Sequence, residues 1–411
     1  MRAVVIGPGL IGCGFAGQLL RESGWDVCFV GRGPIVDVLR RHRRYLVRLV
    51  QGGEAEEVVV EGVSAVPFAD GAAAAGAIAG ADLVVTAVGP ANLAAVAPTI
   101  ATAVAARRSP LDVLAFENLA GAGAHLRRHV ALHLPRGFPL GEFGFAGAVV
   151  QRAVSRRLLP SGAGDWLRFV GEREPTFVVE RPALVGPLPK VIGLCPTDRY
   201  GAHVARKLYT YSAGHAACAY LGYLKGYHYV HTAVRDPEIR AAVREAMAEG
   251  QRGLAARYGP AIAGGPADLD AVLERFGNAG LADPIARVGR DPRRKLSAGD
   301  RLVGAATLAA AAGVPPQKLA QVVAAALVFC DPAEPGCRDL YRQVAEVGVA
   351  GVLAGLAGLG PGDPLVSLVA EHFDRLRRGW SRDNLLLSLE RQQWAWAPGS
   401  GRRPALSGAV V

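Results

Sequence analysis

The chain has 411 residues, which is enough for two or three domains, each with a full hydrophobic core. Hydrophobic residues make up 51% of the chain and charged residues 20%, which excludes an intrinsically disordered protein. The formal net charge is +10, and most of the basic residues are arginine. The one dense basic cluster, residues 40–44, has no interleaved aromatic residues and matches no DNA-reading motif, so we expect no nucleic-acid partner.

No apolar run reaches the roughly 18–20 residues that a membrane-spanning helix needs, so we expect no membrane partner. The first residues fit a strand and a turn better than a signal peptide. The six cysteines form no CxxC pair, and we read them as free thiols of a cytoplasmic protein. His125, His129 and His133 recur at helical spacing but have no further ligand nearby, so we expect no metal site.

The first 120 residues alternate apolar runs with helical patterns, which is typical of a doubly wound parallel sheet. Residues 45–50 and 57–66 flank a QGGE turn and predict a hairpin. An amphipathic helix is predicted from the first glycine-rich turn to about residue 22. Further helices are predicted at 70–79 and 93–106, and buried strands at 2–6, 26–30, 82–88 and 111–116.

The pattern changes after about residue 160. Residues 166–170 and 177–180 predict short antiparallel strands, and almost everything from 197 to 393 predicts helix. Asp236, followed by a proline, is a good helix start. The sequence therefore predicts three parts, which are an α/β domain (1–190), an all-α domain (191–395) and a disordered tail (396–411).

The segment after the first predicted strand reads GPGLIG, a GxGxxG pattern that also opens a helix. Gly7 allows the tight turn, Gly9 lets a pyrophosphate approach the backbone, and Gly12 permits close packing of helix on strand. Leu10 and Ile11 lie at the helix N-terminus, whose free N–H groups favour phosphate. This context predicts dinucleotide binding.

The second predicted strand ends in Gly31 and Arg32, where NAD enzymes usually carry an acidic residue for the ribose hydroxyls. An arginine without a carboxylate favours a 2′-phosphate. We therefore expect NAD or NADP as the cofactor, with NADP favoured and Arg32 as the 2′-phosphate contact. The alternative is that Arg32 stacks on adenine or points to solvent.

A second group of polar residues lies on one predicted helix. Lys207 and His215 are two turns apart on nearly one face, and Ser212 lies beside His215. A lysine near other cations has a lowered pKa, so it can accept a proton from an alcohol. The alternative is a solvated surface lysine with a histidine that belongs to the core.

These segments resemble the mannitol dehydrogenase family of polyol-specific long-chain dehydrogenases, most closely its mannitol-1-phosphate 5-dehydrogenase branch. The resemblance covers about residues 1–330. It implies a Rossmann domain followed by a helical substrate domain, and metal-independent hydride transfer between a nicotinamide and a polyol or ketose, or its phosphate. The segments that carry it are GPGLIGCGF, TAVGP (86–90), FEN (116–118), TDRYGAHVARKLYTYSAGHAACAYLG (197–222) and GRDPRRKLSAGDRL (289–302).

The family motif K-x4-N-x2-H implies Lys207 as general acid/base and His215 as a contact to the substrate oxygen. Its EN motif implies Asn118 as a donor to the developing oxyanion. The resemblance also implies cofactor contacts at Val88 and Gly89. Substrate contacts are implied at Gln151, Arg152, Arg290, Arg294, Lys295 and Arg301. The four residues from 290 onward suit a phosphate; the alternative is a salt-bridged surface between the domains that includes Asp300.

Four positions depart from the family pattern. Ser212 replaces the motif asparagine, Gln151 an aspartate, Gly31 the ribose aspartate and Cys13 an arginine. Another keto sugar in a specialised pathway, or a non-catalytic dinucleotide binder, therefore stays an alternative. A 2-hydroxy-acid enzyme is disfavoured because the sequence shows no His–carboxylate pair. The expected partner is a small polyol or ketose, and the expected state is a monomer or homodimer.

Overall fold

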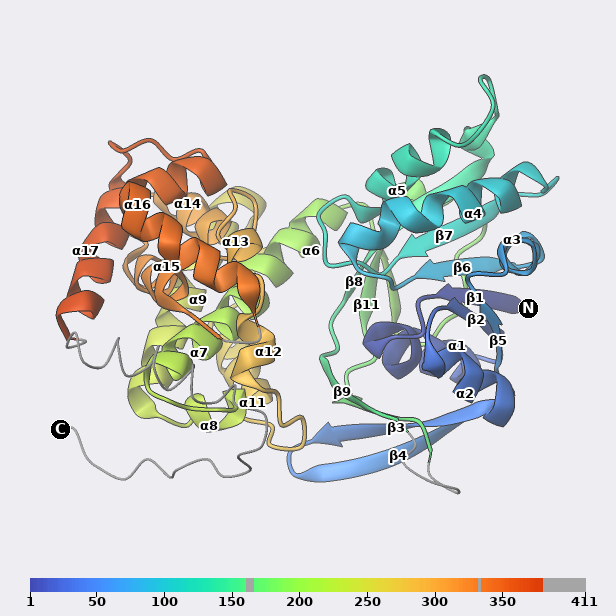
Figure 1. Cartoon of the computed structure of the whole chain (residues 1–411), viewed down its shortest axis with the longest axis horizontal. Coiled ribbons are helices and arrows are strands. Elements are labelled where there is room, and N and C mark those ends of the chain that lie inside the picture. The colour runs from blue at the N-terminus through green and yellow to red at the C-terminus, as the bar shows by residue number, and fades with distance from the viewer. Residues whose placement is uncertain (160–165, 332–333, 380–411) are drawn as a thin grey trace.

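The computed structural model describes residues 1–159, 166–331 and 334–379. These residues form two lobes side by side, one built on β-sheets and one built of helices (Figure 1). The predicted combination of an α/β part and a helical part is confirmed. The predicted tail at 396–411 and the end of the predicted helical region, from residue 380, lie outside the described residues.

The predicted parallel sheet is present and larger than expected. Its strands are β1 (Arg2–Ile6), β2 (Asp26–Gly31), β5 (Ser64–Pro67), β6 (Leu83–Thr86), β7 (Leu111–Ala115), β8 (Phe143–Val150), β11 (Phe177–Glu180) and β12 (Leu194–Thr197). In the part of the chain that is described, their order is β12-β11-β8-β7-β6-β1-β2-β5, and all neighbours are parallel except β8 and β11. The central strands are buried on both faces, which is why they read as unbroken apolar runs.

The predicted hairpin is only partly correct. β3 (Arg44–Gln51) and β4 (Glu54–Glu61) pair antiparallel around the QGGE turn. The second predicted strand does not continue to residue 66, because the chain turns at Gly62 (φ +71°), a conformation that favours glycine. The next residues form β5, which joins the larger sheet beside β2. The apolar run alone did not show this change of sheet.

A second, smaller sheet has the order β4-β3-β10-β9 among the described residues, with β9 (Val154–Leu158) and β10 (Arg168–Glu172). The strands predicted at 166–170 and 177–180 exist and each has an antiparallel neighbour, but they lie in different sheets. β10 pairs with β9 and, in parallel, with β3, whereas β11 pairs with β8. Figure 1 shows β3 and β4 extending beneath the first lobe toward the helical lobe.

The helices of the first lobe are α1 (Gln18–Glu22), α2 (Pro34–His42), α3 (Gly71–Ala79), α4 (Leu93–Ala105) and α5 (Ala122–Ala131). The helix predicted after the glycine-rich turn is present, but Gly12–Gly17 is a buried π-helix rather than a regular α-helix. The Tyr45 hydroxyl donates a hydrogen bond of 2.9 Å to the buried carbonyl of Cys13 in this segment. β3 thereby fixes the helix that follows the turn.

The helical lobe begins directly after β12, the last strand of the larger sheet. Asp236 caps α9 as predicted, since its Oδ1 accepts the N–H groups of Glu238 and Ile239. No helix among the described residues combines the length and apolar character needed to cross a membrane. The helices are α6 (Tyr200–Lys207), α7 (Ala213–Leu224), α8 (Val230–Ala233), α9 (Pro237–Tyr258), α10 (Pro260–Ala263), α11 (Pro266–Phe276), α12 (Ile285–Gly289), α13 (Pro292–Lys295), α14 (Val303–Ala311), α15 (Gln317–Val328), α16 (Pro335–Ala357) and α17 (Pro364–Gly379).

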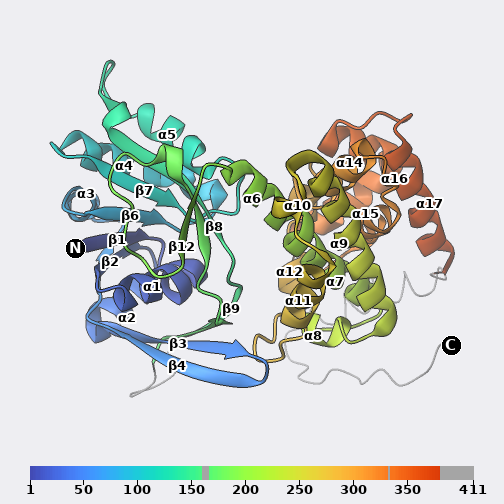
Figure 2. The same ribbon diagram turned by 180° about the vertical axis from the view of Figure 1, so that it is seen from behind.

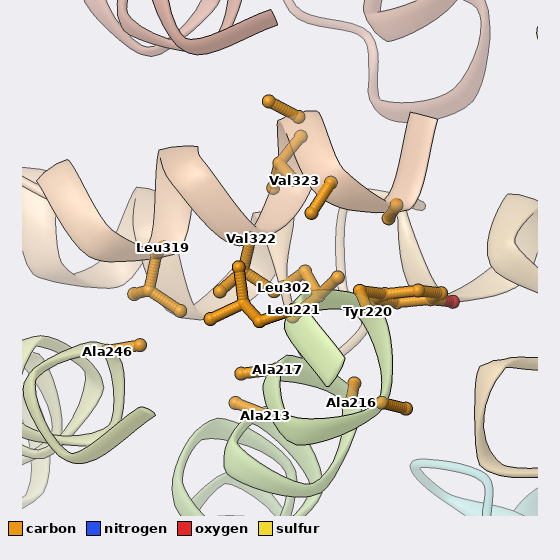
Figure 3. Packing of buried hydrophobic residues seen from close by; sticks show 14 of the residues in the cluster. Ala213, Ala216, Ala217, Tyr220, Leu221, Ala246, Leu302, Leu319, Val322 and Val323 are labelled. Atoms are coloured by element: carbon orange, nitrogen blue, oxygen red, sulfur yellow. The ribbon is translucent and has the colours of Figure 1, made fainter. Parts of the chain in front are cut away.

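Small side chains on α7 let it pack closely at the centre of this lobe. Figure 3 shows Ala213 and Ala217 of α7 in one buried cluster with Leu302 and with Val322 of α15. Tyr220 on α7 is fully buried, and its hydroxyl donates to the Gly289 carbonyl at 3.0 Å. These contacts fix α7 inside the helical lobe.

Among the described residues, the lobes are in contact at α6 and along the smaller sheet. α6 packs against β8 and β11 and leads from the larger sheet into the helical lobe (Figure 2). The smaller sheet reaches the loop after α11, where the Asn278 side chain donates to the Val50 carbonyl at 2.9 Å. In addition, the Ser155 hydroxyl donates to the Leu281 carbonyl at 2.7 Å. The cleft between the lobes is therefore held from two sides.

We predict that Tyr45→Phe lowers the free energy of unfolding by about 1–2 kcal/mol, because the buried Cys13 carbonyl loses its donor. Urea unfolding followed by circular dichroism measures the change. The matched control is Tyr229→Phe, since the Tyr229 side chain is 42% exposed. Equal stabilities of the two variants would show that the hydrogen bond contributes nothing.

Candidate active site

The glycine-rich turn after β1 has the geometry that its sequence predicts. Gly7 has φ +101°, and its N–H donates to the Val30 carbonyl at 2.8 Å, which ties the turn to β2. A Cβ on Gly12 would lie 1.9 Å from the Gly7 carbonyl oxygen, so only glycine fits there. A Cβ on Gly9 would meet nothing within 4 Å, so the backbone is open to a ligand on this side.

A cavity of about 260 Å³ lies over this turn, and we name it the glycine-turn cavity. Gly7, Gly9 and Arg32 line it, together with Phe68 and Arg157. The Arg32 guanidinium lies over the Phe68 ring, 4.8 Å from its centroid. The sequence analysis missed Arg157, because it comes from β9 in the smaller sheet, about 150 residues after the turn.

The glycine at position 31 has a packing cause. A Cβ on Gly31 would lie 2.2 Å from Cδ of Pro8, a rigid ring atom. An aspartate therefore cannot occupy this position while Pro8 is present. The missing carboxylate does not by itself reveal the cofactor, and the argument for a 2′-phosphate rests on the arginines of the cavity.

The central cavity, about 580 Å³ in volume, adjoins the glycine-turn cavity, because Ala87 and Val88 line both. It is lined by Leu10 and Ile11 of the glycine-rich turn and by Lys207 of α6. The remaining lining residues that matter here are Gly89, Asn118, Arg152, Tyr200 and Arg290. Groups from the glycine-rich turn, the strand ends and the start of the helical lobe thus meet in one space.

Glu117 organises one wall of the central cavity. Its buried carboxylate accepts the N–H groups of Val88 and Gly89, both at 2.8 Å. Burial raises the pKa of Glu117, and the two backbone hydrogen bonds act against that rise. The predicted residues Val88 and Gly89 therefore line the cavity, but their N–H groups bind Glu117. The neighbouring Asn118, which the family resemblance implies as a donor to the oxyanion, is exposed and lines the cavity.

Lys207 is the last residue of α6, and its surroundings lower its pKa strongly. Burial, together with the positive charges of Arg301 and Arg275, lowers the pKa of Lys207 to about 8. A lysine in this environment exchanges a proton near neutral pH. The group therefore has the chemistry of a general acid/base.

A π-helical segment, Leu208–Ser212, separates Lys207 from α7. In a regular α-helix, a spacing of eight residues leaves two side chains about 80° apart around the axis. A π-helical turn absorbs about one extra residue, which reduces this angle to about 20°. The segment thus brings Lys207 and His215 closer to one face than a continuous α-helix would.

His215 and Ser212 line a third cavity of about 410 Å³, which we name the arginine cavity. Arg290 lines both this cavity and the central cavity, so the two are neighbours. The four predicted catalytic residues are thus divided, with Lys207 and Asn118 in the central cavity. The arginine cavity is also lined by Arg287, Asp291, Arg294, Lys295, Arg301 and Glu334.

The predicted basic segment supplies the charge of the arginine cavity. Arg301 is 8% exposed; its Nε donates to Asp300 at 2.6 Å, and its Nη2 is buried without a hydrogen-bond partner among the described residues. Arg294 pairs with Asp291 and Asp300 at 2.7 and 2.9 Å. Asp300 is thus a partner of both arginines, yet an unsatisfied guanidinium N–H remains for an anionic ligand.

Lys295, which also lines the arginine cavity, holds part of the backbone of that cavity's wall. Its Nζ donates to the Val288 carbonyl at 2.7 Å and to the Arg290 carbonyl. Burial, together with the charges of Arg301 and Arg294, lowers the pKa of Lys295 to about 7. Lys295 therefore fixes the backbone that carries Arg290.

The structure contains the His–carboxylate pair that the sequence analysis did not find. His215 Nε2 lies 3.2 Å from Asp283 Oδ2, and Arg287 holds both oxygens of the same carboxylate at 2.6 Å. Burial opposes the ionisation of Asp283, but the contacts of His215 and Arg287 lower its pKa to about 2. Nothing local in the sequence links residues 215 and 283. The argument against a 2-hydroxy acid from a missing pair was therefore wrong.

Two predicted substrate contacts are placed differently. Arg152 borders the central cavity, but its guanidinium is buried and donates to the carbonyls of Glu174 and Gly14 and to Gln18. It therefore holds the first lobe together. Gln151 lines none of the three cavities, and its carbonyl accepts a hydrogen bond from Arg275.

The central cavity shares lining residues with each of the other two, so the three cavities are neighbours, with the central one in the middle. The glycine-rich turn and the open helix N-terminus suit a dinucleotide pyrophosphate. No group of three or more His, Cys, Asp or Glu residues within 1–159, 166–331 and 334–379 is arranged to hold a metal ion.

Comparisons with known proteins agree with this geometry. Residues 1–193 match the family profile described as the mannitol dehydrogenase Rossmann domain, and residues 201–347 match the mannitol dehydrogenase C-terminal domain. Mannitol-1-phosphate 5-dehydrogenase of Brevibacillus brevis is 38% identical over 393 residues, which is 93% of this chain and 99% of that protein.

Two solved structures share the fold at low sequence identity. Mannitol 2-dehydrogenase of Pseudomonas fluorescens, solved as a ternary complex with NAD and D-mannitol, has a TM-score of 0.75 at 18% identity, covering 96% of this chain and 94% of that one. A substrate-free D-sorbitol dehydrogenase has a TM-score of 0.71 at 16% identity, covering 92% and 93%. The predicted fold and family are confirmed, and the chain belongs to the mannitol dehydrogenase family of NAD(P)-dependent polyol oxidoreductases.

Proposed function

We propose that this protein interconverts a polyol phosphate and the corresponding ketose phosphate. Mannitol 1-phosphate and fructose 6-phosphate are the first pair to test, because the 38% identical relative is named for that reaction. The observation that carries the proposal is the buried, unpartnered Nη2 of Arg301, in a cationic cavity next to the one that Lys207 lines.

The first lobe supplies the cofactor contacts. Gly7, Gly9 and the helix N-terminus at Leu10 and Ile11 suit the pyrophosphate, and the central cavity suits the nicotinamide. When bound, a nicotinamide dinucleotide supplies hydride transfer to or from the substrate carbon. The wall that Glu117 fixes through Val88 and Gly89 orients that part of the ligand.

The helical lobe supplies the proton and the oxygen contacts. In polyol oxidation, neutral Lys207 Nζ accepts the hydroxyl proton, and in ketose reduction its ammonium form returns one. The amide of Asn118 donates a hydrogen bond to the reacting oxygen. Because His215 Nε2 faces Asp283, Nδ1 is the ring nitrogen that we assign to the substrate, with the Ser212 hydroxyl beside it.

A second candidate is a different keto sugar. Ser212 is buried and lines the arginine cavity with a shorter side chain than the family's asparagine. It therefore leaves more room and one donor fewer near the substrate. A panel of ketoses and ketose phosphates, offered with NADH and NADPH, distinguishes the two candidates.

We predict that the rate of polyol oxidation rises with pH through about 8, because only neutral Lys207 accepts a proton. Ketose reduction falls above the same pH, because it needs the ammonium form. Lys207→Ala costs several orders of magnitude in kcat, while NADH still binds. The control is Lys225→Ala, since Lys225 pairs with Asp236 and Glu238 at the surface. Near-normal turnover of Lys207→Ala would reject the assignment.

We predict that Arg301→Met raises the KM for fructose 6-phosphate about 10- to 100-fold, as expected for a lost charge-assisted contact. Turnover of unphosphorylated fructose changes much less, because the lost partner is the phosphate. Arg293→Met is the matched control, since Arg293 belongs to the same basic segment but binds Gln343 instead. Equal losses with both sugars would move the phosphate site elsewhere.

For the cofactor, we propose a preference for NADP, supported by Arg32 and Arg157 on the glycine-turn cavity. We predict that Arg32→Gln and Arg157→Gln each weaken binding of adenosine 2′,5′-bisphosphate about tenfold and binding of ADP much less. Titration calorimetry measures both, with Arg40→Gln on α2 as the control. Equal losses for both nucleotides would remove the preference.

A further inference from the structure

Arg275, near the end of α11, forms a half-buried ion pair across the two lobes, and its own side chain is 29% exposed. Its Nε and Nη2 donate to the two oxygens of Glu172 on β10 at 3.0 and 2.7 Å. The Glu172 side chain is 6% exposed. Arg275 Nη2 also donates to the Gln151 carbonyl at 2.6 Å, and Glu172 also accepts the N–H of Ala153. The guanidinium is thus held by two separate segments of the first lobe.

The same arginine contacts the helix that carries the candidate catalytic residues. Its guanidinium lies over the ring of Tyr211, 4.6 Å from the centroid, and Tyr211 belongs to the π-helical segment between Lys207 and His215. The adjacent Phe276 stacks on the His215 ring, with centroids 5.2 Å apart and planes at 19°. Tyr211 packs edge-on against Phe276 at 5.1 Å. The end of α11 therefore packs against both Tyr211 and His215.

We propose that Arg275 is a positioning residue for the polyol reaction. Through Glu172 it fixes the first lobe, which carries the cofactor contacts, against the helix face that carries Lys207 and His215. The inference rests on the proposed function, because it assigns Arg275 a role in that reaction.

Electrostatics supports the same role. The Glu172 carboxylate keeps Arg275 charged, since burial alone would lower the pKa of Arg275 and the net shift is upward. Burial, Arg301 and then Arg275 lower the pKa of Lys207. Four charged or titratable groups line the central cavity with Lys207, which are Glu117, Arg152, Tyr200 and Arg290. Arg275 and Arg301 are near enough to lower the pKa of Lys207.

Removing one partner of a buried ion pair leaves an uncompensated charge and costs more than the pair contributes. A purely structural clamp would therefore lower stability and all activities together. A positioning residue that also acts on Lys207 changes the pH dependence of turnover. These two roles predict different kinetics.

The test compares three variants of the full chain. In Arg275→Met, kcat for polyol oxidation falls at least about tenfold, and its pH midpoint moves upward because a positive charge near Lys207 is lost. In Arg275→Lys, kcat falls but the midpoint stays, because the charge remains and the two-point contact to Glu172 is lost. The control is Glu274→Gln. Glu274 lies on the same helix as Arg275, and this change removes only its exposed ion pair with Arg240 of α9.

The NADH dissociation constant is expected to stay within about twofold in all three variants, because the first lobe supplies the cofactor contacts. Unchanged kcat and midpoint in Arg275→Met, or wild-type kcat in Arg275→Lys, would overturn the proposal. Loss of NADH binding in parallel with kcat would also overturn it. If Arg275→Met does not fold, Arg275→Lys and Glu172→Gln decide, each with an expected loss of kcat and an unchanged midpoint.

A readout without substrate separates this inference from the proposed function. Hydrogen exchange of residues 277–284, measured with NADH present, is expected to speed up in Arg275→Met and not in Glu274→Gln. If the wild type oxidises no polyol on the panel, the proposed function fails, whereas faster exchange in Arg275→Met still shows that Arg275 holds the lobes. Unchanged exchange would overturn the clamp itself.

Discussion

One continuous helical rod, residues 200–224, crosses from the larger sheet into the helical lobe, and the candidate site is built around it. Its first part packs against β8 and β11, and its last part is buried among alanines and valines. Both ends are therefore fixed, and the rod cannot turn about its axis. The π-helical segment between them sets which side chains share a face. The positions of Lys207 and His215 follow from this constraint.

Positive charge dominates the surroundings of this rod. Arg301 and Arg275 oppose protonation of Lys207, and Arg301 and Arg294 do the same for Lys295. Each of these arginines has a carboxylate partner, which is Glu172 for Arg275 and Asp300 for Arg294 and Arg301, and these ion pairs hold the cations in place. The same arrangement lowers the pKa of an acid/base and attracts an anion. One set of charges would thus serve both the proton transfer and the phosphate binding of the proposed polyol-phosphate reaction.

Local sequence patterns predicted the elements more reliably than their partners. The four predicted parallel strands, the Asp236 cap and the glycine-rich turn are present, because each depends on neighbouring residues. The missed features depend on residues distant in sequence: β5 leaves the hairpin to join β2, and Arg157 reaches the glycine-turn cavity from β9. Arg152 fits the family pattern, but its guanidinium donates hydrogen bonds to carbonyls within the first lobe.

By itself, the sequence determined the fold class, the glycine-rich turn and the family, and it supplied the candidate site residues, because all of these depend on short motifs and periodic patterns. Only the tertiary structure decided which of those residues meet. It paired His215 with Asp283, divided the catalytic group between two cavities, and left one nitrogen of Arg301 without a partner. The reason is physical: hydrogen bonds, burial and pKa shifts depend on distances through space, and residues far apart in the chain set those distances.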